Sequence, residues 1–225
     1  MGMGAHSHFN HRHLDKRRFV RWAGVILLLM PALGVLGAPS AATAPPVVLV
    51  FGDSLSAAFG IDVEAGWVEL LQQRFDRQGE DYRVVNASIS GDTTAGGLAR
   101  LPQTLAIHGP AIVLVELGGN DGLRGLDLGG MRSNLEEIVR RIRASGAKVL
   151  LLGMRIPPNY GLAYTERFHA IYAEVAERFG VPLVPFLLAG IADNPELMQA
   201  DGIHPKAAAQ EKLLENVWSQ LEPLL

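Results

Sequence analysis

From residue 47 onward the chain alternates short apolar runs with longer amphipathic segments, and this alternation limits the folds that are open to it. Most of the runs are continuously apolar, as expected of strands that are buried on both faces of a sheet. Strands that alternate with helices favour a parallel sheet with right-handed crossovers and helices on both faces. The predicted strands lie at 47–51, 82–86, 111–115, 148–152 and 181–185, and the predicted helices at 67–77, 131–144, 164–179 and 205–221.

Glycine residues mark the ends of three of these predicted helices. Gly79, Gly146 and Gly180 each follow a helical pattern and precede a strand, which is the usual C-terminal position of a helix glycine. The chain shows no internal repeat after its N-terminal segment. We therefore expect residues 45–225 to form one α/β domain, a flavodoxin-like three-layer α/β/α sandwich whose five-stranded parallel sheet has the order 2-1-3-4-5.

Residues 1–44 have a different pattern and are expected to lie outside this domain. Basic residues precede an apolar run at 22–30, and small residues follow at 38–44. Basic, apolar and then small is the order of a secretory signal peptide. The alternative is a retained membrane anchor, but Pro31 and several glycines interrupt a span that is shorter than the roughly 20 residues that a transmembrane helix needs. We predict a signal peptide that is cleaved near 42–44, and a periplasmic or secreted domain without a membrane anchor.

The charge and the cysteine content exclude several classes of function. Lys and Arg number 20 and Asp and Glu number 23; residues 1–44 hold five of the basic and one of the acidic residues, so the remainder has 15 against 22 and a formal charge of −7. An acidic surface argues against a nucleic acid as partner. The chain has no cysteine, which excludes a thiol nucleophile, a disulfide framework and a thiolate metal site.

The residues that could carry out chemistry fall at the carboxyl ends of the predicted strands, where parallel sheets form their sites. Ser54 follows the first strand, Gly91 lies beyond the second and Asn120 follows the third, while Asp201 and His204 open the last helix. In the order 2-1-3-4-5 the first strand lies between the second and the third. The Ser54 loop would then be flanked by the loops that carry Gly91 and Asn120.

These five residues have the types that acyl transfer through a serine requires. A serine hydroxyl is a poor nucleophile until a base takes its proton, and His204 could be that base. Asp201, three residues earlier, could hold the other imidazole nitrogen. The backbone N–H groups of Ser54 and Gly91 and the side-chain amide of Asn120 could stabilise the negative charge on the substrate carbonyl oxygen.

Each motif also has a simpler interpretation when it is taken alone. The sequence Gly52-Asp53-Ser54 after a strand is often only a turn with a helix cap. His204 could be a residue at a helix start, because Pro205 suits the first helical position, and His108 or His169 could be the base instead. The occurrence of all these motifs in one order, each at the end of a strand, favours the catalytic interpretation.

The same residues resemble the SGNH-hydrolase family, also called GDSL lipases or esterases, over residues 47–221. Within that family the flanking sequences are most similar to the periplasmic acyl-CoA thioesterase, lysophospholipase and arylesterase subgroup. The resemblance implies a Ser54, Asp201 and His204 triad, an oxyanion hole formed by Ser54, Gly91 and Asn120, and no metal or cofactor. The four family blocks are matched by Gly52-Asp53-Ser54-Leu55, Gly91, Gly118-Gly119-Asn120-Asp121 and Asp201-Gly202-Ile203-His204.

The resemblance also implies which substrates the protein acts on. Relatives hydrolyse esters and thioesters, including acyl-CoA, aryl esters and lysophospholipids, and we expect a monomer that acts on such small molecules. The loop at 155–161 contacts the acyl chain in relatives, so Ile156 and Pro157 are expected to contact substrate. Asp53, next to Ser54, is also expected to contact substrate. Pro158 is a second proline in this loop and a departure from the family, and it should stiffen the loop by fixing φ. The preferred acyl-chain length therefore does not carry over.

Two other functions stay open at this point. A carbohydrate O-deacetylase would need polar and aromatic residues to bind sugar, and the motif loops are poor in aromatic residues. A non-catalytic nucleotide-binding or phosphate-binding flavodoxin-like domain could bind an anion at the turn after the first strand. That alternative explains neither Asn120 nor the pair formed by Asp201 and His204, and Asp53 would place negative charge at the phosphate.

Overall fold

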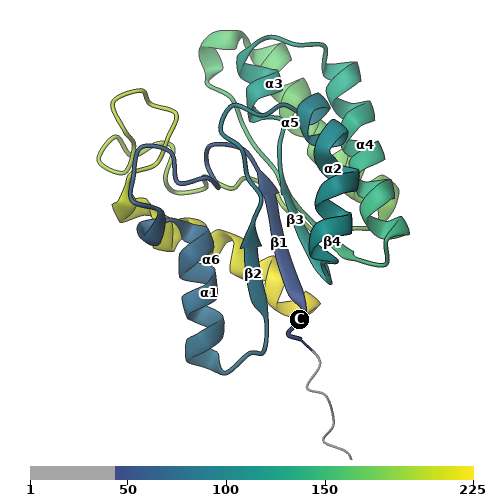
Figure 1. The fold of residues 1–225 in the computed structure, drawn as a ribbon. Helices are drawn as coiled ribbons and strands as arrows, with labels where there is room; N and C mark the ends of the chain where they lie inside the picture. Colours follow the sequence, from purple (N-terminus) through teal and green to yellow (C-terminus); the bar gives the residue numbers. More distant parts are fainter. Residues whose placement is uncertain (1–43) are drawn as a thin grey trace, which may run out of the picture. The chain divides into compact units, whose positions relative to one another are not determined.

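A computed structural model describes residues 44–225, and these residues form a five-stranded parallel sheet with the order β2-β1-β3-β4-β5 (Figure 1). The fold class and strand order that we predicted from the sequence are confirmed. The predicted signal peptide lies outside the described residues, except for its last residue. The strands are β1 (Val47–Gly52), β2 (Arg83–Asn86), β3 (Ile112–Glu116), β4 (Lys148–Leu152) and β5 (Leu183–Val184).

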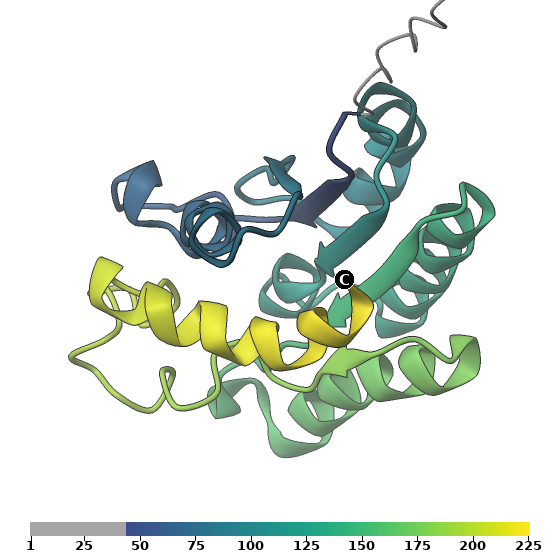
Figure 2. The same cartoon turned by 90° about the horizontal axis from the view of Figure 1, so that it is seen from below.

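Helices cover both faces of the sheet (Figures 1 and 2). Helices α1 and α6 pack together on one face, while α2, α4 and α5 form a row on the other. Within residues 44–225, none of the helices combines the length and the apolar character needed to span a membrane. The α-helices are α1 (Trp67–Gln78), α2 (Thr94–His108), α3 (Gly119–Leu123), α4 (Leu128–Ala144), α5 (Leu162–Phe179) and α6 (Gln210–Leu221), and the 3₁₀ turns are at Val63–Ala65, Pro158–Tyr160, Ala207–Ala209 and Glu222–Leu224.

The strands differ in burial according to their place in the sheet. Strands β1 and β3 are buried along their whole length, whereas β2 lies at an edge and is partly exposed. Strand β5 has two residues, so the longer strand that we predicted at 181–185 is wrong in its extent. Pro182 and Pro185 flank β5, and a proline has no N–H to donate to a neighbouring strand.

Helix α2 was not among the predicted helices, because Gly96, Gly97 and Pro102 weaken its helical pattern. Its first turn is stabilised by the Thr93 side chain, which accepts a hydrogen bond from the N–H of Gly96 at 3.2 Å. A Cβ atom at Gly97 would lie 2.4 Å from the Leu117 side chain. The glycine therefore allows α2 to lie close against the sheet, and this packing outweighs its low helix propensity.

The last helix begins later than its sequence pattern indicates. We expected it to start at Pro205, with His204 at its N-terminus, but α6 starts at Gln210 after the 3₁₀ turn. The segment before that turn forms a closed loop: the N–H of Gln199 donates to the carbonyl of His204 at 2.7 Å, and Pro205 forms a β-bridge with Met198. The expectation that His204 lies at a helix N-terminus is therefore wrong.

Candidate active site

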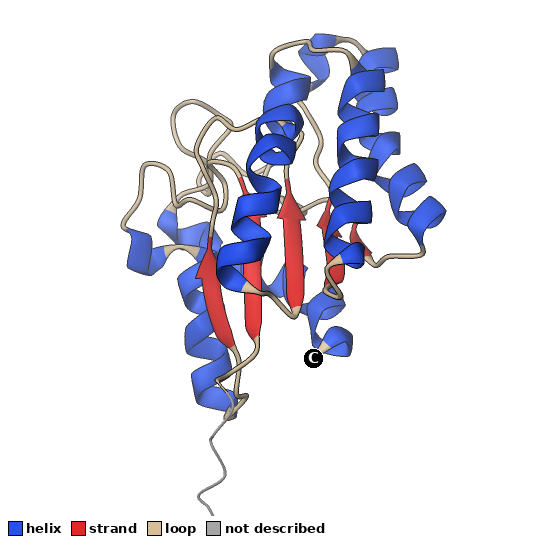
Figure 3. Ribbon diagram, turned by 45° about the vertical axis from the view of Figure 1, so that its right-hand side comes forward, coloured by secondary structure: helices blue, strands red, loops and turns tan. Residues whose placement is uncertain are grey.

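Ser54, His204 and Asp201 form a continuous chain of contacts above the carboxyl ends of the strands, the edge toward which all strand arrows point in Figure 3. The hydroxyl oxygen of Ser54 is 2.9 Å from Nε2 of His204. Nδ1 of His204 is 2.7 Å from Oδ2 of Asp201. Ser54 follows β1 directly, while the other two lie in the loop before α6. The fold thus brings together the hydroxyl, imidazole and carboxylate that we predicted.

Hydrogen bonds from its own loop hold Asp201 in its ionised form. Oδ1 accepts the N–H of Ile203 at 2.9 Å and the N–H of His204 at 3.0 Å. Partial burial alone would raise the pKa of Asp201, but these bonds and the His204 side chain outweigh it and lower the pKa to about 2. An ionised carboxylate accepts a proton-bearing nitrogen, so Nδ1 carries the imidazole proton and Nε2 is free to accept one from Ser54.

Phe59 covers one face of the imidazole. The ring centroids of Phe59 and His204 are 4.5 Å apart with the planes tilted by 37°. Phe59 lies in the same loop as Ser54, and its N–H donates to the carbonyl of Ser54 at 3.2 Å. This contact restricts the rotation of the imidazole ring. Phe59 was not predicted as part of the site, because an isolated aromatic residue in a loop belongs to no sequence pattern.

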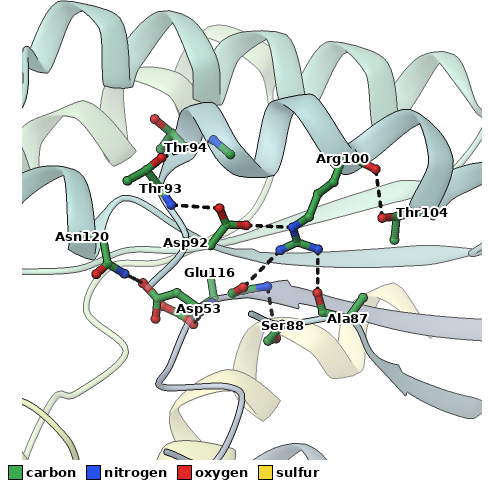
Figure 4. Close-up of polar contacts among 12 residues, drawn as sticks. Asp53, Ala87, Ser88, Asp92, Thr93, Thr94, Arg100, Thr104, Glu116 and Asn120 are labelled. Carbon is green, nitrogen blue, oxygen red and sulfur yellow. Dashed lines mark hydrogen bonds and ion pairs between the residues drawn. The ribbon is translucent and has the colours of Figure 1, made fainter. Parts of the chain in front are cut away.

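Gly91 and Asn120 lie on the two loops that flank Ser54. Gly91 has a φ of +81°, a conformation that residues with a side chain rarely adopt. Arg124 joins the two loops, since its Nη2 donates to the carbonyl of Gly91 at 2.8 Å and lies 3.4 Å from Oδ1 of Asn120. Nδ2 of Asn120 donates to Oδ2 of Asp53 at 2.9 Å (Figure 4). One of its two amide hydrogens therefore stays available for another acceptor.

A network of charged side chains ties the Gly91 loop to the sheet (Figure 4). Arg100 binds Oδ2 of Asp92 through Nε at 2.7 Å and the carbonyl of Gly52 through Nη2 at 3.2 Å. The N–H of Thr94 donates to Asp121 at 2.9 Å, which links this loop to the one that carries Asn120. Together these contacts place the two flanking loops before any substrate arrives.

Two buried carboxyl groups lie directly below the Ser54 loop. Glu116, the last residue of β3, accepts hydrogen bonds through Oε2 from the N–H of Asp53 at 3.0 Å and from the hydroxyl of Ser56 at 2.9 Å. Burial, and after it the neighbouring Asp53 carboxyl, raises the pKa of Glu116 well above its ordinary range, although the bonds from the Asp53 N–H and the Ser56 hydroxyl oppose this effect. Burial also raises the pKa of Asp53 to about 6, against the hydrogen bonds that its carboxyl accepts. Glu116 was not predicted as part of the site, although an acid that directly follows an apolar strand was a visible signal.

A cavity of about 1240 Å³ opens beside the triad, and Ser54, Gly91, Asn120 and His204 all line it. The three residues predicted to contact substrate differ in how far they are exposed to this cavity. Ile156 is buried and Pro157 half-buried in the wall, whereas Asp53 is only 2% exposed and its carboxyl is already bonded to Leu55 and Asn120. The rest of the apolar lining includes Leu123, Met154, Phe186 and Leu188.

The other two histidines of the domain do not contact Ser54. His169 of α5 lines the cavity, but its Nδ1 is 3.1 Å from the carbonyl of Met154 and its Nε2 is 3.3 Å from Arg155. His108 ends α2 and does not line the cavity. Among residues 44–225 no group of three or more His, Asp and Glu side chains is arranged to hold a metal ion.

Comparison with known proteins gives consistent matches. The family model described as the GDSL-like Lipase/Acylhydrolase family matches residues 50–212. The chain is 58% identical to Esterase TesA of Pseudomonas aeruginosa over 182 residues. The aligned residues cover 81% of this chain and 90% of that protein. It is 45% identical over 184 residues to Thioesterase 1/protease 1/lysophospholipase L1 of Escherichia coli K12, with 82% and 87% covered. The crystal structure of TesA superposes with a TM-score of 0.78 at 58% identity and covers 80% of this chain and 99% of that one.

Proposed function

The chain belongs to the GDSL-like lipase/acylhydrolase family, and we propose that it hydrolyses carboxylic esters and thioesters through an acyl-serine intermediate. The observation that carries the proposal is the contact of 2.9 Å between the Ser54 hydroxyl and Nε2 of His204, whose other nitrogen lies against Asp201. A hydroxyl, a base and an orienting carboxylate in this arrangement are what serine nucleophiles need for activation.

In the acylation step, Ser54 Oγ attacks the carbonyl carbon of the ester while His204 Nε2 takes the hydroxyl proton. The carbonyl oxygen gains negative charge and accepts hydrogen bonds from the N–H groups of Ser54 and Gly91 and from the amide of Asn120. The ionised Asp201 stabilises the imidazolium. His204 then returns the proton to the departing alcohol or thiol, which leaves the acyl group on Ser54.

In the deacylation step, a water molecule replaces the leaving group. His204 takes a proton from this water as its oxygen attacks the acyl carbon, and the same three donors stabilise the second oxyanion. Collapse of this intermediate breaks the bond to Ser54 Oγ, to which His204 returns the proton. The products are the free carboxylic acid and the restored hydroxyl, so the cycle requires no metal or cofactor.

The cavity supports an acyl chain as the part of the substrate that is bound. Ile156, Pro157, Leu123 and Met154 give it an apolar wall beside Ser54. A relative at 45% identity is named as a thioesterase and lysophospholipase, which fits an acyl group carried on either a thiol or a lysophospholipid. Asp53 contributes through Asn120 rather than by touching the substrate, because its carboxyl is bonded within the loop.

Neither of the other two functions is favoured by the site. A carbohydrate deacetylase would bind sugar through polar and aromatic groups, whereas the cavity has an apolar wall that includes Leu123, Met154 and Ile156. A phosphate binder would need a helix N-terminus at the Ser54 turn, but α1 starts only at Trp67. The carboxylate of Asp53 beside Ser54 would also repel a phosphate.

We also propose that residues 1–44 are a signal peptide, which is removed when domain 45–225 is exported to the periplasm or the medium, where it acts as a monomer. The support is the order of basic, apolar and small residues. N-terminal sequencing of protein recovered from a periplasmic fraction should find a start near residues 42–45. Recovery of only the full-length chain, in the membrane fraction, would contradict this proposal.

The catalytic proposal is tested with a panel of p-nitrophenyl esters, acyl-CoA thioesters and lysophospholipids, incubated with purified protein and with the Ser54→Ala variant. We expect turnover of all three classes by the native protein and loss of turnover in the variant. Ester hydrolysis that survives Ser54→Ala at the native rate would overturn the proposal.

A further inference from the structure

Glu116 is a fully buried acid beside the Ser54 loop that the proposed mechanism does not use. It ends β3 in register with Gly52 of β1. A Cβ atom at residue 52 would lie 2.6 Å from Glu116 Oε2, so the glycine leaves the space that the carboxyl group occupies. Oε2 accepts two hydrogen bonds, whereas Oε1 has no hydrogen-bond partner in the part of the chain that the structure describes.

The surroundings of Glu116 favour its neutral form. None of the ion pairs between residues 44 and 225 includes Glu116, so no cation compensates a charge at this depth. Its nearest electrostatic partner is the Asp53 carboxyl, which lies beside it (Figure 4). Two adjacent buried carboxyl groups do not both ionise, and they share one proton at neutral pH.

The two acids differ in how their oxygens are bonded: Glu116 accepts both of its hydrogen bonds through Oε2 and leaves Oε1 without a partner among residues 44–225, whereas Asp53 has a donor on each carboxyl oxygen. Asp53 accepts the N–H of Leu55 at 3.2 Å and Nδ2 of Asn120 at 2.9 Å, and both donors favour a negative charge on Asp53. Burial raises the pKa of Glu116 well above its ordinary range but that of Asp53 only to about 6. At neutral pH Asp53 is therefore the anion and Glu116 the acid.

The charge on Asp53 determines how the Asn120 amide is turned. The NH₂ group of Asn120 faces the Asp53 carboxylate, and its oxygen faces the Arg124 guanidinium at 3.4 Å. An anion on one side and a cation on the other fix one orientation of the amide. This orientation leaves the second amide hydrogen for a substrate oxygen.

We propose that Glu116 is a positioning residue: as a neutral carboxylic acid it holds Asp53 in the place from which Asp53 orients the Asn120 amide beside Ser54. The inference rests on the proposed function, because the orientation of Asn120 matters only if an oxyanion forms. Glu116 itself does not line the cavity and acts only through Asp53 and the backbone of its loop.

The other charged or titratable groups near the pair are few. His204, in the loop before α6, interacts electrostatically with Asp53. Tyr172 of α5 interacts electrostatically with both acids, and its hydroxyl donates to the carbonyl of Leu117 at 2.9 Å. Asp121 of α3 acts on Tyr172 and is engaged by Thr94. Arg100 of α2 reaches the carbonyl of Gly52, but its charge is paired with Asp92.

The first test compares Glu116→Met, which has a similar length but no polar group, with Glu116→Gln, whose amide can accept and donate. We expect Glu116→Met to lower kcat by about 10-fold to 100-fold with KM within about threefold, because a displaced oxyanion donor weakens transition-state stabilisation. Glu116→Gln should restore kcat to within about threefold of the native value. Native kcat in Glu116→Met, or an equal loss in both variants, would overturn the proposal.

The matched control is Glu136→Gln. Glu136 is a buried glutamate on α4 whose carboxylate is paired with Arg178 at 2.7 Å and Arg132 at 3.1 Å, and it does not line the cavity. Its variant should lose stability but keep the native kcat. A fall in kcat in Glu136→Gln as large as in Glu116→Met would show that the loss reflects general destabilisation and would overturn the proposal.

A second measurement does not depend on activity or on the folding of Glu116→Met. Infrared spectra at pH 8, where Asp53 is ionised, should show the carbonyl stretch of a protonated buried carboxylic acid in the native protein. The band should be absent from Glu116→Gln and present in Glu136→Gln. Its absence from the native protein would overturn the proposal. Failure of the native protein to hydrolyse any ester would contradict the proposed function while leaving this band in place, so the two failures can be told apart.

Discussion

The hydroxyl oxygen of Ser54 lies 2.9 Å from Nε2 of His204, although 150 residues separate the two in the chain. The parallel sheet makes this meeting possible, because Ser54 follows β1, the strand between β2 and β3, and the loop before α6 returns to the same edge of the sheet. Hydrogen bonds then hold each side chain in place. Glu116 accepts the N–H of Asp53 and Asp53 accepts that of Leu55, which fixes the Ser54 loop, while Asp201 holds Nδ1 of His204. The proposed chemistry depends on this contact.

Replacement of Asp201 by Asn should lower kcat by about 10²-fold to 10⁴-fold and leave KM within a few-fold. The amide would present a donor to Nδ1 and favour the imidazole tautomer that cannot accept the Ser54 proton. Because the pKa of Asp201 is lowered to about 2, its ionisation should not limit the native rate above about pH 4. Steady-state kinetics from pH 5 to pH 9 check both points, and an Asp201→Asn enzyme with the native kcat would refute this role.

Replacement of Asn120 by Ala should lower kcat by about 10²-fold to 10³-fold, the usual cost of removing one oxyanion donor. KM should change little, because the donor acts on charge that develops in the transition state. Asn120→Asp should lose at least as much activity, since a carboxylate cannot donate and would lie against Asp53. A rise in KM with unchanged kcat in Asn120→Ala would instead assign Asn120 to ground-state binding.

The sequence was sufficient to predict the strand order and the convergence of the triad residues, because both follow from general rules for parallel sheets. It was not sufficient to predict where α6 begins. Pro205 has the residue type of a first helical position, but contacts that pair Gln199 with His204 and Met198 with Pro205 close that segment into a loop. Such pairings depend on tertiary contacts that no local pattern carries.

The support beneath the site was also missed, for a related reason. In the sequence, Glu116 is a single acid after an apolar run. An acid in this position could be exposed to water at the end of a strand or buried, and the sequence does not distinguish the two. Only the register of β3 with β1 places it against Gly52 and the backbone of Asp53. Phe59 was missed likewise, because its contact with His204 depends on how two loops meet.

Replacement of Ile156 by Ala should lower the ratio of kcat/KM for p-nitrophenyl octanoate over acetate by about fivefold or more. Ile156 is 6% exposed in the cavity wall, and each methylene that loses its apolar contact costs about 0.8 kcal/mol. Leu213→Ala in α6 is the matched control. Like Ile156→Ala, it should lower the free energy of unfolding by about 2–5 kcal/mol, but it should leave the octanoate-to-acetate ratio unchanged. An unchanged ratio in Ile156→Ala would remove this residue from the acyl-binding wall.

The raised pKa of Asp53 predicts how stability varies with pH. Burial raises the pKa of its carboxyl to about 6 in the folded protein, against the ordinary value of 3.8 that applies to the unfolded chain. The unfolded chain loses the proton first, so the stability that this proton provides is fully present below about pH 4 and is lost as the pH rises to about 6. Asp53→Asn does not titrate, so its unfolding free energy relative to the native protein should increase between these pH values and then level off. Urea denaturation at several pH values measures the difference, and a constant difference would contradict the assignment.

The most direct test of the central claim is covalent labelling with a fluorophosphonate, followed by mass mapping of the modified peptide. The probe should add to Ser54 in the native protein, should label His204→Ala far more slowly, and should not label Ser54→Ala, which should also lose ester hydrolysis by about 10⁴-fold or more. Ser145→Ala, a change on the surface after α4, should label like the native protein. A label on any residue other than Ser54, or rapid labelling of Ser54 in the absence of His204, would contradict the account.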